Sequence, residues 1–82
     1  MSLYLDVHTI EGVTTDAAAQ AHAADLRTQG RFGAHFLRYW VNEPEGKVFC
    51  LIEAPSAEVA TAVHKEAHGL LADDVFAVQE GV

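Results

Sequence analysis

The fold is decided by the middle of the chain, where residues 34–54 read AHFLRYWVNEPEGKVFCLIEA. Two stretches rich in aromatic and β-branched residues, 34–42 and 47–54, flank a turn that contains Pro44 and Gly46. This pattern is typical of two antiparallel strands joined as a hairpin. Pro55 cannot donate a hydrogen bond to a neighbouring strand, so it ends the second strand. The residues therefore predict a β-hairpin at the centre of the fold.

On the N-terminal side of this hairpin, the sequence predicts a strand and then a helix. Residues 3–9 alternate with period two, so that apolar residues share one face and Tyr4, Asp6 and His8 share the other. An alanine-rich helix is expected to begin after an N-cap at Thr14 and to run to about Gln29. Gly30 is its expected C-terminal stop.

On the C-terminal side, the sequence predicts a second helix and a last strand. Ser56 is the expected N-cap of a helix that reaches about His68, and Gly69 is its expected stop. Residues 75–79 have the composition of a short strand. The order strand, helix, strand, strand, helix, strand predicts an α+β, ferredoxin-like split βαβ fold. Its four-stranded antiparallel sheet carries both helices on one face.

The chain has 82 residues, which is the size of a single domain spanning residues 1–82. Its second sheet face must be either wet or covered by a partner. Trp40, Phe36, Tyr4 and one face of the third strand are too apolar for an exposed sheet. We therefore expect a two-fold homodimer of the dimeric α+β barrel type that covers the open face.

The charge balance is acidic, with 5 Lys and Arg against 12 Asp and Glu and a formal net charge of −7. This balance argues against nucleic acid or an anionic membrane surface as partner and favours cations. No apolar stretch approaches the roughly 20 residues of a membrane span, and no secretory pattern opens the chain. The single cysteine, Cys50, cannot form an internal disulfide. A reducing, cytoplasmic setting is the expected location.

The most specific local feature is the pair His64 and His68. Two histidines four residues apart lie on one face of a helix, where both imidazoles can bind one divalent transition metal. Glu66 stands two residues after the first histidine rather than one, so the metalloprotease signature is absent. The helical wheel centres the buried stripe on Val59, Val63, Ala67 and Leu70. Both histidines are then expected toward solvent, either as a surface metal site or as two solvated side chains.

Asp6 and His8 are a second candidate pair, because a carboxylate and an imidazole on one strand face can bind a metal ion or act as an acid–base pair. They could equally be ordinary polar residues of a two-faced strand. His22 stands in the predicted apolar stripe of the first helix, next to Leu26. It is either a core histidine with a hydrogen-bond partner or an inward-facing ligand. Cys50 is expected to be a small buried residue, and a thiolate ligand only if the fold brings a histidine to it.

Four stretches together resemble a family of small actinobacterial nickel-binding, nickel-responsive proteins. They are LYLDVH (3–8), LRYWV (37–41), VFCLIEAP (48–55) and HKEAHG (64–69). The resemblance spans nearly the whole chain. It implies a ferredoxin-like dimer that binds Ni²⁺ at its surface and serves nickel sequestration or detoxification rather than catalysis. Imidazole and carboxylate ligands suit Ni²⁺, although other divalent transition metals can occupy such sites. Neutral imidazole is the ligand, so binding is expected to weaken below about pH 6.

Two alternatives remain open. The first is a small dimeric α+β-barrel enzyme, monooxygenase- or isomerase-like, with an organic ligand at the open sheet face beside Tyr4, Asp6 and His8. The second is a dimerising domain whose histidines bind any transition metal weakly. An open histidine site normally binds Cu²⁺ more tightly than Ni²⁺, so nickel binding alone does not separate these readings.

Overall fold

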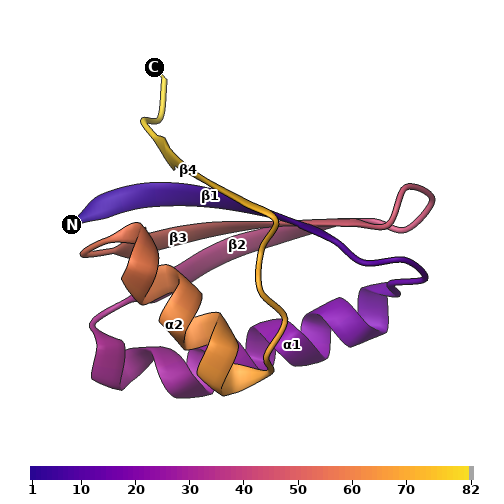
Figure 1. Cartoon of the computed structure of the whole chain (residues 1–82), viewed down its shortest axis with the longest axis horizontal. Helices are drawn as coiled ribbons and strands as arrows, with labels where there is room; N and C mark the ends of the chain where they lie inside the picture. The colour runs from indigo at the N-terminus through magenta and orange to yellow at the C-terminus, as the bar shows by residue number, and fades with distance from the viewer. Residues whose placement is uncertain (82) are drawn as a thin grey trace.

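The structure is a computed structural model that describes residues 1–81. Its elements are β1 (Ser2–Thr9), α1 (Thr15–Thr28), the 3₁₀ turn η1 (Gln29–Phe32), β2 (His35–Asn42), β3 (Lys47–Ala54), α2 (Ala57–Ala67) and β4 (Asp74–Val78). The strands form one antiparallel sheet in the order β2-β3-β1-β4. Both helices cover the same face of this sheet (Figure 1). The predicted α+β, ferredoxin-like fold is therefore confirmed.

The predicted caps explain where most helix ends lie. The side-chain oxygen of Thr14 accepts a hydrogen bond from the backbone N–H of Ala17, and that of Ser56 accepts one from the N–H of Val59. Each cap satisfies a donor that the first helical turn leaves free. At the other end of α2, Gly69 has a left-handed φ of +79°, as expected of a helix-terminating glycine.

The end of the first helix differs from the expectation. Gln29 keeps right-handed helical angles, so the chain continues through the 3₁₀ turn to Phe32. The residue with a positive φ is Gly33, at +67°, and not Gly30. The prediction placed the helix end at Gly30, the first glycine after the helical pattern. The helical turns end instead at Gly33, where the backbone adopts a left-handed conformation that glycine allows.

The two faces of β1 are separated as predicted, but the polar face lies inside the molecule. Asp6 and His8 are 1 % and 3 % exposed and face the helices together with Tyr4. Their partners on β3 are Cys50 opposite Asp6 and Val48 opposite His8, both buried. The apolar residues of β1 are left on the open sheet face: Leu3, Leu5 and Val7.

The buried faces of both helices are rotated from the predicted stripes. In α1 the buried residues are Ala18 and Asp25, whereas Leu26 is 44 % exposed. In α2 they are Ala60, Val63 and His64. The expectation that His64 faces solvent was therefore wrong. A hydropathy pattern within one helix cannot show that other elements provide hydrogen-bond partners for a buried imidazole.

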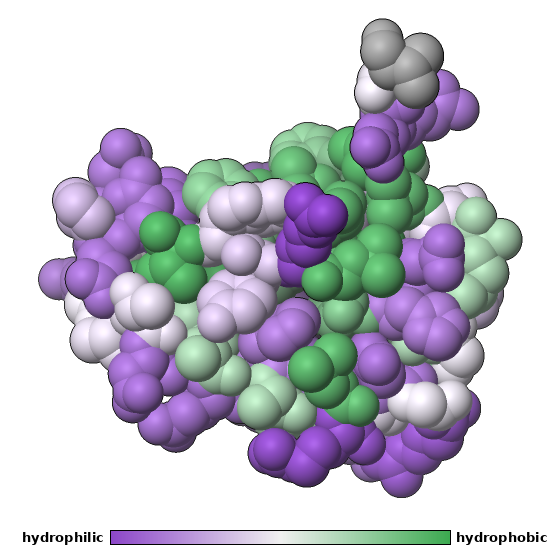
Figure 2. All heavy atoms as spheres, turned by 180° about the vertical axis from the view of Figure 1, so that it is seen from behind, coloured by the Kyte–Doolittle hydropathy of each residue, from purple (hydrophilic) through white to green (hydrophobic). Residues whose placement is uncertain are grey.

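The open sheet face carries several large apolar side chains. Trp40 and Phe76 are 48 % and 51 % exposed on this face. Figure 2 shows hydrophobic residues gathered in the upper part of the molecule, where the sheet lies. Phe36 and Tyr4 were expected here but pack on the helical side instead, Phe36 in the buried core. Among residues 1–81, no helix has the length and apolar character that crossing a membrane requires.

Candidate metal centre

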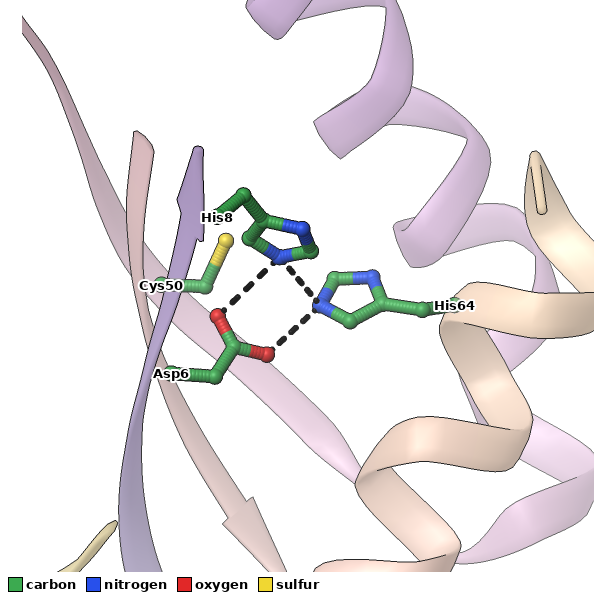
Figure 3. Close-up of side chains that lie close together, drawn as sticks. All are labelled: Asp6, His8, Cys50 and His64. Carbon is green, nitrogen blue, oxygen red and sulfur yellow. Dashed lines mark hydrogen bonds and ion pairs between the residues drawn. The ribbon is translucent and has the colours of Figure 1, made fainter. Parts of the chain in front are cut away.

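Four side chains with metal-binding atoms meet in the interior, between the sheet and α2. They are Asp6 and His8 from β1, Cys50 from β3 and His64 from α2, and one ligand atom of each lies within 4.8 Å of all the others. All four residues are buried. Figure 3 shows the four side chains converging from the sheet and the helix. The antiparallel register explains half of this arrangement, since Asp6 and Cys50 are direct cross-strand partners and His8 follows on the same face.

The shortest contacts join the carboxylate of Asp6 to the two imidazoles. Its Oδ2 lies 2.8 Å from Nε2 of His64, and its Oδ1 lies 3.2 Å from Nε2 of His8. The two Nε2 atoms are 3.3 Å apart. Three potential ligand atoms thus surround one point in the interior, with the thiol of Cys50 beside them (Figure 3).

The other nitrogen of His64 contacts a carboxylate on the neighbouring helix. Nδ1 of His64 lies 2.9 Å from Oδ1 of Asp25, which also lies 3.0 Å from Nε2 of His68. Nδ1 of His68 accepts a hydrogen bond from the backbone N–H of Leu70, so a neutral His68 ring carries its proton on Nε2 and donates it to Asp25. With Nδ1–H of His64 also donating to Asp25, we assign Nε2 as the free ligand atom of a neutral His64.

Opposite charges hold the side chains of the cluster together. Burial lowers the pKa of His64, but hydrogen bonds to Asp25 and Asp6 outweigh it and raise the pKa to about 11. Burial likewise lowers the pKa of His8, and its hydrogen bond to Asp6 raises it to about 9. Burial would raise the pKa of Asp6, yet hydrogen bonds from His64 and His8 lower it to about 2. Protons on the imidazoles therefore supply the positive charge that the buried carboxylates need.

The spacing of these atoms fits a transition-metal ion. Two ligand atoms bound to one ion at about 2.1 Å lie roughly 3.0–3.4 Å apart for bond angles between 90° and the tetrahedral value. The separation of 3.3 Å between the two Nε2 atoms falls in this range. The two contacts with Asp6 use different oxygens, 3.2 Å from His8 to Oδ1 and 2.8 Å from His64 to Oδ2. Imidazole, carboxylate and thiol donors together suit ions of intermediate softness.

The predicted site residues are thus partly brought together. His64, His8 and Asp6 belong to one cluster, and the predicted pair of His64 and His68 is also brought together, with Nδ1 of His64 3.2 Å from Nε2 of His68. These two histidines and Asp25 form a second group that could hold a metal ion. His22 is not one of the four residues of the cluster; its ring lies on Tyr39, with centroids 4.6 Å apart.

Sequence reasoning missed Asp25, the acidic residue that orients His64. A signal was present, because Asp25 follows His22 by three residues and shares its face of an otherwise alanine-rich helix. Cys50 was assigned a ligand role only if a histidine came close to it, and the fold brings two.

A pocket of about 220 Å³ reaches the cluster from the helical side of the sheet. Its walls include His8, His22, Asp25 and His64, and its exposed lining residues, Glu11 and Leu70 among them, mark where it opens to the surface. The alternative enzyme reading placed its ligand on the open sheet face, whereas the pocket beside the histidines and Asp25 is on the opposite side.

Comparison with known proteins gives two matches to this chain. The family described as "Nickel responsive protein SCO4226-like" matches residues 4–78. A crystal structure of SCO4226 from Streptomyces coelicolor A3(2) superposes with a TM-score of 0.91 at 36 % sequence identity, covering 99 % of this chain and 100 % of that one. No curated protein matches. The chain therefore belongs to the SCO4226-like family of nickel-responsive proteins.

Proposed function

We propose that this protein binds Ni²⁺ at Asp6, His8, Cys50 and His64 and sequesters it. The observation that carries the proposal is the convergence of four buried donor atoms within 4.8 Å. Buried ionisable groups are costly to a fold unless they are paired or bind a metal. The family description makes nickel the first candidate among the ions that this donor set suits.

Burial of all four donors favours retention of the ion over catalysis. Catalytic metal sites keep a position open for substrate, whereas closed sites surround the ion with protein ligands. Here the donor side chains are interior, so protein ligands would surround a bound ion except where the pocket reaches the cluster. Sequestration or detoxification follows as the role of such a site. The single buried thiol suits a reducing compartment, and we propose the cytoplasm as its location.

We also propose that two copies pair through their open sheet faces. The half-exposed side chains of Trp40 and Phe76 lie there beside the outward residues of β1. An apolar face of this kind marks an interaction surface, and a second copy offers the same apolar face with two-fold symmetry. The metal cluster lies on the opposite side of the sheet, so pairing leaves it within each chain.

The test is calorimetric titration of tag-free protein with Ni²⁺, repeated with Co²⁺, Zn²⁺ and Cu²⁺. We expect one Ni²⁺ per chain with a Kd of about 1 μM or below. His8→Gln should weaken binding at least tenfold, whereas His35→Gln, which changes an exposed histidine on β2, should leave it unchanged. Equal binding by both variants, with circular dichroism showing both folded, would remove the interior cluster as the nickel site.

Cysteine ligation can be tested separately. Thiolate bound to Co²⁺ gives charge-transfer absorption in the near ultraviolet, which imidazole and carboxylate ligands lack. Cys50→Ser should abolish this absorption and shift the metal preference away from soft ions. Absorption that is absent from the wild-type protein would reduce the donor set to Asp6, His8 and His64.

A further inference from the structure

A second convergence of donor atoms lies on the other side of the His64 ring from the four-residue cluster. Oδ1 of Asp25 lies 2.9 Å from Nδ1 of His64 and 3.0 Å from Nε2 of His68, and these two nitrogens are 3.2 Å apart. Two ligand atoms bound to one ion at about 2.1 Å lie roughly 3.0 Å apart when the bond angle is 90°. The three atoms therefore match neighbouring ligand positions of an ion with 90° bond angles, such as tetragonal Ni²⁺.

His64 belongs to both groups through different nitrogens. Its Nε2 faces Asp6 and His8, whereas its Nδ1 faces Asp25. Figure 3 shows this second ring nitrogen turned away from the other three side chains of the cluster. The two groups are thus neighbours on opposite sides of one imidazole ring. An ion can move between them by exchanging the ligands on one side of the ring for those on the other.

The pocket connects the second group with the surface. All three of its residues line the pocket of about 220 Å³, and exposed Glu11 lines the same pocket. Among residues 1–81, no lysine or arginine lines it, whereas Glu11 and Asp25 supply carboxylates. Carboxylates without a lysine or arginine beside them attract cations. The lining therefore suits the entry of a metal ion.

His68 is the member of the second group that solvent reaches most easily. Its side chain is 13 % exposed, whereas those of Asp25 and His64 are 2 % exposed. The backbone N–H of Leu70 donates to Nδ1 of His68, which leaves Nε2 directed at Asp25. His68 is also the C-cap of α2, where the partial negative charge of the helix end favours a cation. The residue is therefore oriented to meet an entering ion.

We propose that Asp25, His64 and His68 form an uptake position, which binds the entering metal ion before the ion moves to the four-residue cluster. This inference rests on the proposed nickel site, which is the destination of the ion. The uptake position supplies three protein donors, and water from the pocket fills the other positions of the ion. The cluster supplies four donors and is more deeply buried, so it holds the ion more firmly.

The test follows the visible absorption of bound Co²⁺ after rapid mixing with tag-free protein. His68→Gln removes the ring nitrogen without widening the pocket, because glutamine has a similar length. Loss of a residue that only supports a ligand already costs roughly tenfold in metal binding, so this variant should load at least tenfold more slowly. Release to a chelator should slow by a similar factor, because a position on the path affects both directions. The final affinity should change less than tenfold.

His35→Gln, the same change at an exposed histidine of β2, is the control and should load at the wild-type rate. Loading of His68→Gln at the wild-type rate would overturn the proposal. So would a loss of affinity that arises only from faster release, because His68 would then hold the ion in its final position. Circular dichroism checks that each variant is folded.

Equilibrium titration separates this inference from the proposed nickel site. His8→Gln removes a donor of the cluster alone, so this variant should keep a weaker Co²⁺ site at the uptake position. Adding His68→Gln to it should abolish that residual binding. Residual binding that survives in the double variant would overturn the uptake position. Binding by His8→Gln that is as tight as in wild type would instead contradict the proposed nickel site.

Discussion

Nδ1 of His64 lies 2.9 Å from Oδ1 of Asp25, although the two residues stand 39 positions apart in the sequence. This contact joins α1 to α2 and fixes which nitrogen of His64 faces the cluster. Carboxylates that hold a metal-binding histidine in this way tune its affinity as well as its orientation. In the proposed nickel site, Asp25 would therefore position His64 rather than bind the ion.

Asp25→Asn should weaken Ni²⁺ binding by about 10–100-fold while all four donors remain in place. Asparagine keeps an oxygen that accepts from His64 but loses the charge that makes the imidazole a stronger ligand. Calorimetry gives the affinity, and Asp16→Asn on the exposed first turn of α1 is the control. An unchanged affinity in Asp25→Asn would show that Asp25 serves only packing.

His68→Ala should reduce nickel affinity less than tenfold, whereas His64→Ala should abolish binding. His68 is not one of the four proposed donors, although its Nε2 lies 3.0 Å from Oδ1 of Asp25 and 3.2 Å from Nδ1 of His64. Its own Nδ1 accepts a hydrogen bond from the N–H of Leu70. The two variants are compared by titration and by equilibrium dialysis. An equal loss of nickel affinity in both variants would support a site in which His64 and His68 bind the ion together.

The stability of the metal-free protein should be greatest between about pH 4 and 6.5. His64 and His8 have folded pKa values of about 11 and 9 against 6.5 in the unfolded chain, so their contribution is complete below pH 6.5 and is lost as pH rises toward those values. The pKa of Asp6 is about 2 in the folded chain against 3.8 in the unfolded chain. Its contribution to stability is therefore complete above about pH 4 and is lost as the pH falls toward 2. Urea unfolding with a chelator present measures the curve. A stability that rises from pH 6.5 to 9 would contradict the charged cluster.

Nickel binding at pH 7 should release close to two protons per ion from the imidazoles, and a third from Cys50 where its thiol binds as thiolate. The raised pKa values of His64 and His8 mean that both imidazoles hold a proton that the metal must displace. Affinity should therefore still be increasing at pH 9, because the pKa of His64 is about 11, and it should already be weakened well above the pH 6 expected for ordinary histidines. Titrations in buffers of different ionisation enthalpy count the protons. Release of less than half a proton would mean that binding occurs elsewhere.

Phe76→Glu should convert a dimer into a monomer in sedimentation velocity. The substitution places a charge on the open face, where burial against a second copy would leave it unpaired. Leu71→Glu is a matched control, because Leu71 is equally exposed but lies in the connection before β4. A wild-type protein that sediments as a monomer at all concentrations would remove the pairing proposal.

The fold could be predicted from the sequence because its signals are local. The turn around Pro44 and Gly46, the caps at Thr14 and Ser56 and the stop at Gly69 each act within a few residues.

The centre could be predicted only in part because its contacts are not local. Hydropathy placed Leu26 inside and His64 outside, the reverse of the structure. Asp25 on α1 and His64 on α2 can both be buried because each supplies the charge or hydrogen bond that the other needs. The hydropathy pattern of a single helix gives no sign of such a contact between two helices.

The inward polar face of β1 has a consequence for how the chain finds its register. A slip of one residue would turn Asp6 and His8 outward and bring Leu5 and Val7 inside. Apolar burial alone favours that slipped pairing in a single chain. The ionic contacts of Asp6 and His8 oppose it, and the proposed second copy would oppose it too by covering Leu5 and Val7 on the open face. The apolar residues of β1 that we propose to pair with a second copy are thus the same residues that, in a single chain, favour the slipped register.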